Sequence, residues 1–258
     1  MSEPVVVFNN VSKEYPLYHH ITGGFKRFLF NLPEAIRSMR RTSLKVFEQL
    51  TFSIEKGETF GILGRNGAGK STTLGLMAGV IRPTSGTVKV RQRVSPLLEL
   101  GSGFHPELTG LENIELNGVL LGLSRREVLA RRDQIIEFSE IGEHILQPIR
   151  TYSTGMIARL GFSVVAHLDP QLMLIDEVLA VGDIAFREKC TQKMQSFKEQ
   201  GVTMVLVSHS PAAVEEICDR AMWIHDGTAQ CIGSPHEVVQ AYTEAMTGHA
   251  PSSALAML

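Results

Sequence analysis

The segment Gly64–Ser71, with the sequence GRNGAGKS, has residue types that suit phosphate binding. Its glycines allow backbone N–H groups to curl around phosphate oxygens, and a helix starting at its end adds a positive dipole end. In the pattern GxxxxGK[ST], the lysine reaches the β- and γ-phosphates and the hydroxyl is a ligand for Mg²⁺. We therefore predict a nucleoside triphosphate site. Its expected contacts are Gly64, Asn66, Gly67, Ala68, Gly69, Lys70, Ser71 and Thr72, with Ser71 also at the metal.

An acidic pair, Asp176 and Glu177, follows the apolar run LMLI at residues 172–175. Beside a phosphate-binding loop, Asp176 is expected to hold Mg²⁺ through water, and Glu177 to polarise the attacking water. His209 follows another apolar run, MVLV at 204–207, from which its imidazole would reach the γ-phosphate or that water. The alternative for His209 is a structural role. The sequence has no NKxD-type base-reading string, which weighs against a GTPase.

Buried strands and capped helices must position these residues. The spacings Thr109-x-x-Glu112 and Ser124-x-x-Glu127 match capping boxes, and residues 105–168 have an almost wholly helical pattern. Near-continuous apolar runs indicate a sheet that is buried on both faces. We therefore predict an α/β core with an inserted α-helical subdomain. The β-rich runs are VVVF (5–8), TFGIL (59–63), LMLID (172–176), TMVLVS (203–208) and AMWI (221–224).

The composition limits the class of protein. The chain has 258 residues, with 25 Lys and Arg against 27 Asp and Glu. This balance argues against a protein that binds nucleic acid through a basic charge spread over its whole surface. Cys190, Cys218 and Cys231 lack CxxC spacing and are expected to be buried thiols in a reducing compartment. No apolar run approaches the roughly 20 residues of a membrane span, and the N-terminus lacks the features of a secretory signal. We expect a soluble cytoplasmic protein with a frayed tail at 241–258.

Residues 16–46 differ from the rest of the chain. They hold six Lys or Arg against one acid, Glu34, and these charges are interleaved with Phe and Leu. About 30 residues exceed what a turn between two strands needs. A solvated linker or a surface helix is one interpretation, and an interfacial helix is the other.

With these elements in order, the chain resembles the ATP-binding-cassette family over nearly all of residues 4–240. The string YSTGM at 152–156 stands where that family has its signature sequence, usually LSGGQ. The resemblance implies that Ser153 and Gly155 serve the ATP held by a second subunit. It also implies that Asp183, in AVGD, lies in the D-loop that links the two sites, and that Tyr15 stacks on adenine. A Tyr15 that only ends the first strand is the alternative.

Two departures from the family pattern narrow the resemblance. The glutamine expected between the phosphate loop and the helical subdomain is missing, and Glu99 in LLELGSGF stands nearest its place, as a candidate metal ligand. Met156 replaces the signature glutamine. Both departures, with the 16–46 insertion, are similar to the ATPase subunits that export O-antigen, capsule or teichoic acid, which share LELGxGF, ELTGxEN and YSxGM.

The resemblance implies a P-loop ATPase core with a mixed β-sheet flanked by helices, an antiparallel β subdomain and the helical subdomain. It implies an ATP- and Mg²⁺-dependent homodimer beneath two membrane permease subunits, on the cytoplasmic face of the membrane, which exports lipid-linked polysaccharide. Glu177 would be the base and His209 the γ-phosphate sensor. A drug or lipid exporter subunit and a soluble cassette ATPase are the alternatives.

The insertion is then expected to lie near the membrane. Lys26, Arg27, Arg40 and Arg41 would face the phosphate groups of the carrier lipid or acidic headgroups beside it. The competing hypothesis is a surface helix that only docks on the permease.

Overall fold

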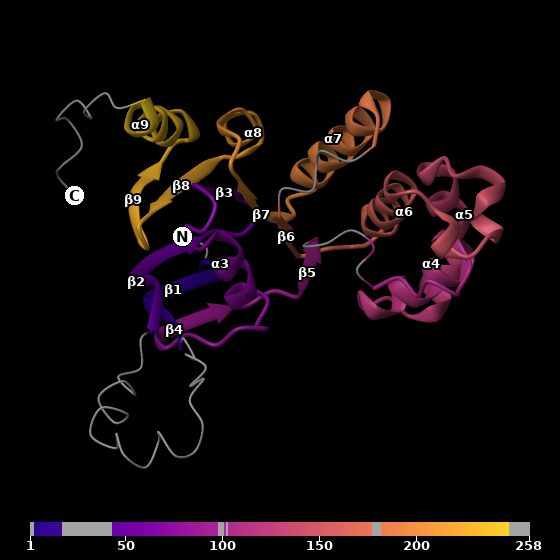
Figure 1. Cartoon of the computed structure of the whole chain (residues 1–258), viewed down its shortest axis with the longest axis horizontal. Coiled ribbons are helices and arrows are strands. Elements are labelled where there is room, and N and C mark those ends of the chain that lie inside the picture. The colour runs from indigo at the N-terminus through magenta and orange to yellow at the C-terminus, as the bar shows by residue number, and fades with distance from the viewer. Residues whose placement is uncertain (1–2, 17–42, 98–100, 102, 177–181, 248–258) are drawn as a thin grey trace, which may run out of the picture.

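The computed structural model describes residues 3–16, 43–97, 101, 103–176 and 182–247, which form two sheets and a set of helices (Figure 1). Glu177, Glu99 and the four basic residues of the insertion therefore lie outside the described residues. The strands are β1 Val6–Pro16, β2 Ser43–Ile54, β3 Thr59–Leu63, β4 Ser85–Val90, β5 Val94–Leu97, β6 Leu172–Asp176, β7 Thr203–Ser208, β8 Arg220–His225 and β9 Thr228–Gly233. The helices are α3 Lys70–Met77, α4 Gly110–Leu120, α5 Arg125–Ser139, α6 Thr154–Ala166, α7 Ile184–Glu199, α8 Pro211–Ile217 and α9 Pro235–Thr247, with 3-10 turns at Gly142–Leu146 and Ile149–Thr151.

The larger sheet has the strand order β5-β6-β7-β3-β8-β9. Every neighbouring pair is parallel except β8 and β9. Leu63 of β3 pairs with Ser208 of β7, and Asp176 of β6 pairs with Val207. The carboxyl ends of β3, β6 and β7 therefore meet at one edge of the sheet, where open α/β sheets commonly bind ligands.

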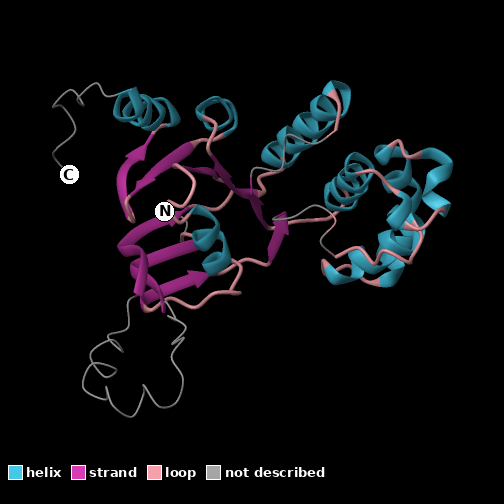
Figure 2. Ribbon diagram, in the orientation of Figure 1, coloured by secondary structure: helices cyan, strands magenta, loops and turns pink. Residues whose placement is uncertain are grey.

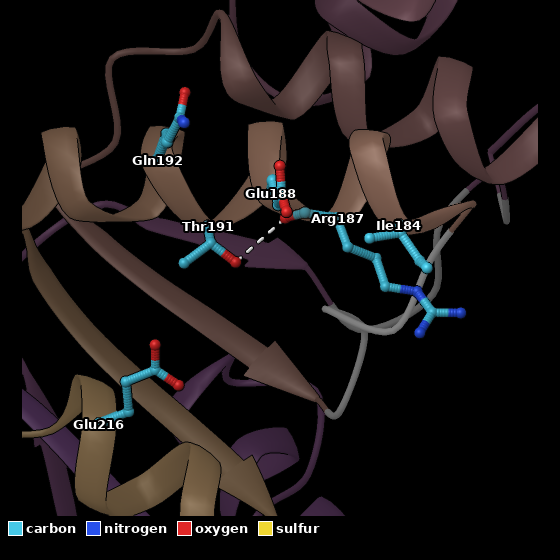
Figure 3. A pocket seen from close by; sticks show the side chains of 6 residues that line it. All are labelled: Ile184, Arg187, Glu188, Thr191, Gln192 and Glu216. Atoms are coloured by element: carbon cyan, nitrogen blue, oxygen red, sulfur yellow. Dashed lines mark hydrogen bonds between the residues drawn. The ribbon is translucent and has the colours of Figure 1, made fainter.

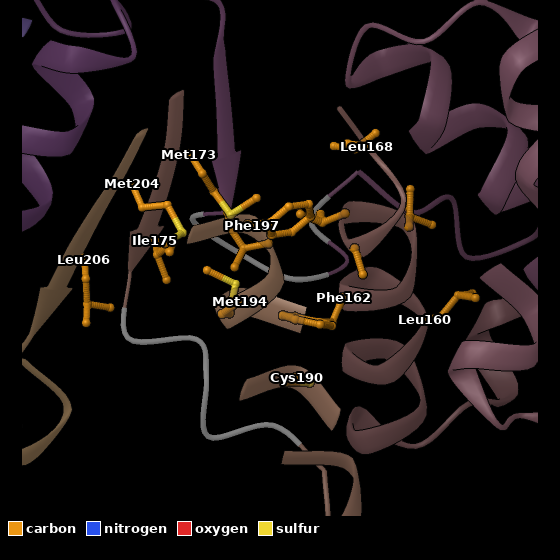
Figure 4. Close-up of a cluster of buried hydrophobic side chains, with 14 of the residues drawn as sticks. Leu160, Phe162, Leu168, Met173, Ile175, Cys190, Met194, Phe197, Met204 and Leu206 are labelled. Atoms are coloured by element: carbon orange, nitrogen blue, oxygen red, sulfur yellow. The ribbon is translucent and has the colours of Figure 1, made fainter. Parts of the chain in front are cut away.

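Side chains of the larger sheet divide between two cores, as expected for strands buried on both faces. Leu172 and Leu174 point into the core shared with α3 and the smaller sheet. Met173 and Ile175 point into the opposite core, where Figure 4 shows them beside residues of α6 and α7. The prediction that these apolar runs form buried strands is confirmed.

The smaller sheet is antiparallel, with the order β2-β1-β4. It packs on the larger sheet through stacked rings, because Phe52 lies between Phe8 (centroids 4.5 Å apart) and Phe60 (5.6 Å). The pairing of β1 with β2 extends to Pro16 and Ser43. The predicted insertion, residues 16–46, is therefore too wide at both edges. Pro16 belongs to β1 and residues 43–46 belong to β2, and these two strands pair with each other.

Helices α4, α5 and α6 form a group at one end of the molecule (Figure 2). Both predicted capping boxes are confirmed. The hydroxyl of Thr109 accepts a hydrogen bond from the Glu112 N–H while the Glu112 carboxylate bonds back to Thr109, and Ser124 does the same with Glu127. The reciprocal bonds satisfy donors that a helix start otherwise leaves unpaired.

Two smaller expectations differ from the structure. The expected tail at 241–258 begins inside a helix, since α9 continues to Thr247 and packs Tyr242 against the core. Cys190 and Cys218 are buried as expected, whereas Cys231 is only half-buried because it lies on β9 at the sheet edge.

The capping box of α5 generates a prediction for stability. Ser124→Ala should lower the free energy of unfolding by about 1 kcal/mol, whereas Ser124→Gly should cost only a few tenths, because glycine is tolerated at an N-cap. Urea denaturation followed by circular dichroism measures both. A Ser124→Ala variant as stable as the wild type would show that the capping bonds do not stabilise this helix.

Candidate functional site

The predicted phosphate loop connects the carboxyl end of β3 to the start of α3. Gly69 is the N-cap of α3 and has φ +100°, a left-handed conformation that favours glycine. At Gly64, a Cβ atom would lie 2.7 Å from the Ile224 carbonyl oxygen of β8, so a larger residue would not fit. The local sequence thus permits the tight path from strand to helix that a phosphate loop requires.

Lys70 lies inside the curl of this loop. Its Nζ donates hydrogen bonds to the carbonyl oxygens of Gly64 (2.8 Å) and Arg65 (3.1 Å), and the residue is only 8% exposed. These bonds hold the ammonium group at the centre of the loop. A bound phosphate group would meet the cation there together with the backbone N–H groups of the α3 start.

Ser71 and Asp176 come together although 105 residues separate them. The Ser71 Oγ donates a hydrogen bond to the Asp176 Oδ2 at 3.2 Å, because α3 starts beside the carboxyl end of β6. A hydroxyl and a carboxylate oxygen are the hard ligands that Mg²⁺ prefers. Among the described residues, no group of three or more His, Cys, Asp or Glu forms a metal cluster. The pair therefore fits an ion that also takes ligands from water and nucleotide phosphates.

His209 lies at the same sheet edge. It directly follows β7, its side chain is exposed, and it stands between two serines that shape the turn. The Ser210 N–H donates to the Ser208 Oγ at 3.0 Å, and Ser210 is the N-cap of α8. The parallel sheet thus brings His209, Asp176 and the phosphate loop to one edge, and the role of His209 at the γ-phosphate stays a prediction.

Ser153 and Gly155 lie elsewhere, at the start of α6. The Ser153 hydroxyl accepts a hydrogen bond from the Met156 N–H at 3.2 Å and caps the helix. Tyr152 precedes this start and fixes its position, because its buried hydroxyl donates a hydrogen bond to the His144 carbonyl oxygen at 2.6 Å. Burial also raises the pKa of the Tyr152 phenol. Figure 1 shows α6 with α4 and α5, away from α3. The structure does not bring these residues to the phosphate loop of the same chain.

Asp183 is the N-cap of α7. Its Oδ1 accepts a hydrogen bond from the Phe186 N–H at 3.0 Å, and its Oδ2 accepts one from Arg159 at 2.6 Å. The Phe186 N–H, followed by the Arg159 charge, lowers the pKa of the Asp183 carboxyl. Sequence reasoning missed Arg159. Its signal was a single charge in an otherwise apolar helix, TGMIARLGFSVVA, which indicates a paired and partly buried ion.

Tyr15 lies in β1, where it pairs with Leu44 of β2 and is half-buried. The Lys13 ammonium lies 4.6 Å from the centroid of the Tyr15 ring, a cation–π contact on the ring face. This places Tyr15 in the smaller sheet, within the strand rather than beyond its end. Its role in adenine stacking stays a prediction.

A shallow pocket of about 410 Å³ lies between α7 and α8 (Figure 3). It shares no residue with the predicted sites. The residues that line it are Ile184, Arg187, Glu188, Thr191, Gln192 and Glu216.

Comparison with known proteins identifies the family. The ABC transporter family model matches residues 47–180. The O-antigen export system ATP-binding protein RfbB of Klebsiella pneumoniae is 53% identical over 94% of this chain and 99% of its own length. The teichoic acids export ATP-binding protein TagH of Lactiplantibacillus plantarum is 43% identical over 92% of this chain and 64% of its own. The chain therefore belongs to the ABC transporter family.

Solved structures agree on the fold. A dimeric ATP-binding cassette in a post-hydrolysis state, bound to ADP and phosphate, superposes with a TM-score of 0.69 at 21% identity. It covers 89% of this chain and 98% of its own. The ATP-binding subunit of another ABC transporter has a TM-score of 0.70 at 22% identity over 96% of this chain and 95% of its own. The predicted α/β cassette fold is thus confirmed. Among the described residues, none of the helices is long and apolar enough to cross a membrane.

Proposed function

We propose that this chain is the ATP-hydrolysing subunit of a membrane exporter of lipid-linked polysaccharide, such as O-antigen, capsule or teichoic acid. The contact between Ser71 and Asp176 beside the phosphate loop carries the ATPase part of the proposal. The names and the near-complete overlap of the O-antigen relatives support the polysaccharide part. The sequence departures at Glu99 and Met156 point to the same subgroup.

Each residue of the sheet edge has a distinct task in this proposal. Lys70 binds the β- and γ-phosphates, while Ser71 and Asp176 hold Mg²⁺, which neutralises charge on the phosphate oxygens when bound. Glu177, the next residue after Asp176, accepts a proton from the attacking water. His209 contacts the γ-phosphate from the end of β7.

The second half of each ATP site comes from another copy of the chain. The start of α6 presents backbone N–H groups and a positive dipole end, which suit a γ-phosphate. The separation of α6 from α3 within one chain supports the assignment of Ser153 and Gly155 to a partner's nucleotide. The dimeric state of a solved structural neighbour supports this homodimer.

Two integral-membrane permease subunits complete the exporter, which places this chain on the cytoplasmic face of the membrane. The ATP-dependent opening and closing of the homodimer then drives the permease. The ATP-binding role of the relatives, named as components of export systems, supports these partners. The proposal includes no nucleic acid partner.

The base assignment makes a direct prediction. Glu177→Gln should keep ATP binding and lower turnover at least a hundredfold, because an amide cannot accept the proton of the water while Asp176 still holds the metal. A stable ATP-bound dimer should accumulate on size-exclusion chromatography. Hydrolysis at the wild-type rate would remove Glu177 from this role.

If each ATP site combines the phosphate loop of one chain with the α6 start of its partner, substitutions in these two parts should cause different defects. Lys70→Ala should weaken ATP binding to the monomer by about 1.5–3 kcal/mol, at least tenfold in Kd, because it removes a charged hydrogen-bond donor. Gly155→Asp should leave monomer binding intact but prevent ATP-dependent dimerisation, since a carboxylate would face the partner's γ-phosphate.

The Gly155 substitution is sterically mild in the monomer. Among the described residues outside the α6 backbone, a Cβ atom there would come within 4 Å of the Ser153 Oγ alone, at 3.8 Å. Calorimetric titration with ATP and sedimentation in the Glu177→Gln background separate the two defects. Equal loss of monomer binding in both variants would contradict the assignment of Ser153 and Gly155 to the partner's site.

The insertion is proposed to contact the phosphate groups of the carrier lipid or nearby acidic headgroups. Replacing Lys26, Arg27, Arg40 and Arg41 together by Glu should stop polymer export in cells while ATP hydrolysis and permease association persist, because the contact is electrostatic. Surface polymer is measured by immunoblot, and association by co-purification.

The matched control reverses three exposed basic residues on the described surface, Lys56, Lys89 and Arg126, and should export normally. If the four-residue variant also exports normally, the insertion does not recognise phosphate. If it no longer co-purifies with the permease, the insertion is a docking element.

A further inference from the structure

The phosphate loop contains one of the two Asn-Gly pairs in the sequence, Asn66-Gly67, and the other pair is Asn117-Gly118. In such a pair the backbone nitrogen of the glycine can attack the side-chain amide of the asparagine, because glycine has no Cβ atom to hinder the approach. The reaction needs an accessible asparagine side chain and a glycine N–H that no hydrogen bond holds. The two pairs differ in both respects.

Asn66 and Gly67 are exposed, and they lie in the loop that connects β3 to α3. Gly67 has φ +84°, and a Cβ atom placed on it would meet no atom within 4 Å beyond its chain neighbours. Within the part of the chain that the structure describes, neither the Asn66 side chain nor the Gly67 N–H makes a hydrogen bond. The loop therefore leaves both reacting groups open to solvent and able to approach each other.

Asn117 and Gly118 lie inside α4 and provide an internal control. Gly118 is buried, and a Cβ atom there would lie 2.5 Å from the Val128 Cγ2. The N–H of a residue inside an α-helix donates to the carbonyl oxygen four residues earlier, so the Gly118 nitrogen is held. The Asn117 Nδ2 atom is buried as well. The fold therefore protects this pair from the reaction that the sequence alone would allow.

The phosphate loop also stabilises negative charge, which the reaction develops. The glycine nitrogen attacks after losing its proton, and the addition intermediate carries the charge on the side-chain oxygen of Asn66. The Lys70 ammonium is held within the loop by the carbonyl oxygens of Gly64 and Arg65, at 2.8 and 3.1 Å. Helix α3 starts at Lys70 and adds its positive dipole end. The features that suit a phosphate group therefore favour this attack whenever no nucleotide is bound.

We propose that Asn66 is a site of spontaneous deamidation that inactivates the nucleotide-free phosphate loop. The Gly67 nitrogen forms a bond to the Asn66 Cγ, and the bond from Cγ to Nδ2 breaks. The leaving amide nitrogen takes up the proton that Gly67 has lost and departs as ammonia. Water then opens the five-membered imide at either of its two carbonyl groups, which leaves aspartate or isoaspartate at position 66.

Either product adds a negative charge to a loop that otherwise suits phosphate. Because like charges repel, and more strongly where water is displaced, the modified chain should bind ATP at least tenfold more weakly. Bound ATP should in turn protect Asn66, since phosphate oxygens accept hydrogen bonds from the backbone N–H groups of such a loop and cover it. This protection rests on the proposed function, whereas the modification itself does not.

Incubation of the full chain without nucleotide at alkaline pH, followed by peptide mapping with mass spectrometry, tests the proposal. The peptide that contains Asn66 should convert, while the peptide that contains Asn117 stays unmodified. In the urea-unfolded chain both peptides should convert at similar rates, because unfolding frees both pairs. Calorimetric titration should show that ATP affinity falls as the modified fraction of Asn66 rises. The control variant Asn66→Gln should keep its own initial ATP affinity over the same incubation, because glutamine forms the larger imide ring far more slowly.

An Asn66 that stays unmodified in the folded chain but converts in urea would overturn the proposal. So would conversion of Asn117 in the folded chain at the rate of Asn66, or an ATP affinity that full conversion does not change. Saturating ATP and Mg²⁺ in the Glu177→Gln variant should slow conversion of Asn66 at least tenfold. If ATP binds without slowing the conversion, the protection is wrong. If Asn66 converts and the unmodified chain binds no ATP, the proposed function fails while the modification stands.

Discussion

The parallel register of β6, β7 and β3 is the constraint on which the site depends. Leu63 pairs with Ser208, and Asp176 pairs with Val207, so three strands end at nearly the same level. Parallel strands need long crossover connections, and these contain α3, α7 and α8, the helices that come next in the chain after β3, β6 and β7. The hydrogen bond between Ser71 and Asp176 follows from this arrangement. A register shift in any of the three strands would separate the hydroxyl from the carboxylate.

The sequence predicted those parts of the fold in which local pattern and tertiary environment agree. The apolar runs of β3, β6 and β7 are buried on both faces, and their sequences are accordingly almost continuous in apolar residues. Strands β4 and β9 were missed because most of their residues are exposed or half-buried and the runs are polar. Strand β5 contains Pro96, which argues against a strand, but it lies at the sheet edge where proline is tolerated.

The candidate site also has parts that the sequence predicted and parts that it did not. The phosphate loop and Asp176, the acid that ends β6, were predictable, because a short string and an adjacent apolar run define each of them. The contacts of Arg159 were not, because Glu140, Arg159 and Asp183 meet only after α5, α6 and α7 have packed together. Phe138, Phe162 and Phe186 contact one another in that interface. The aromatic packing sets the distances that the guanidinium then spans.

Gly155, at the start of α6, is a glycine that packing among the described residues does not explain. Glycine inside a helix costs about 0.5–1 kcal/mol relative to alanine. Gly155 has no left-handed φ, and a Cβ atom there would meet only the Ser153 Oγ among the described residues. Contrast Gly110, where a Cβ atom would lie 2.3 Å from the Tyr152 hydroxyl and packing alone requires glycine. Packing among the described residues therefore does not require glycine at position 155, in contrast to position 110.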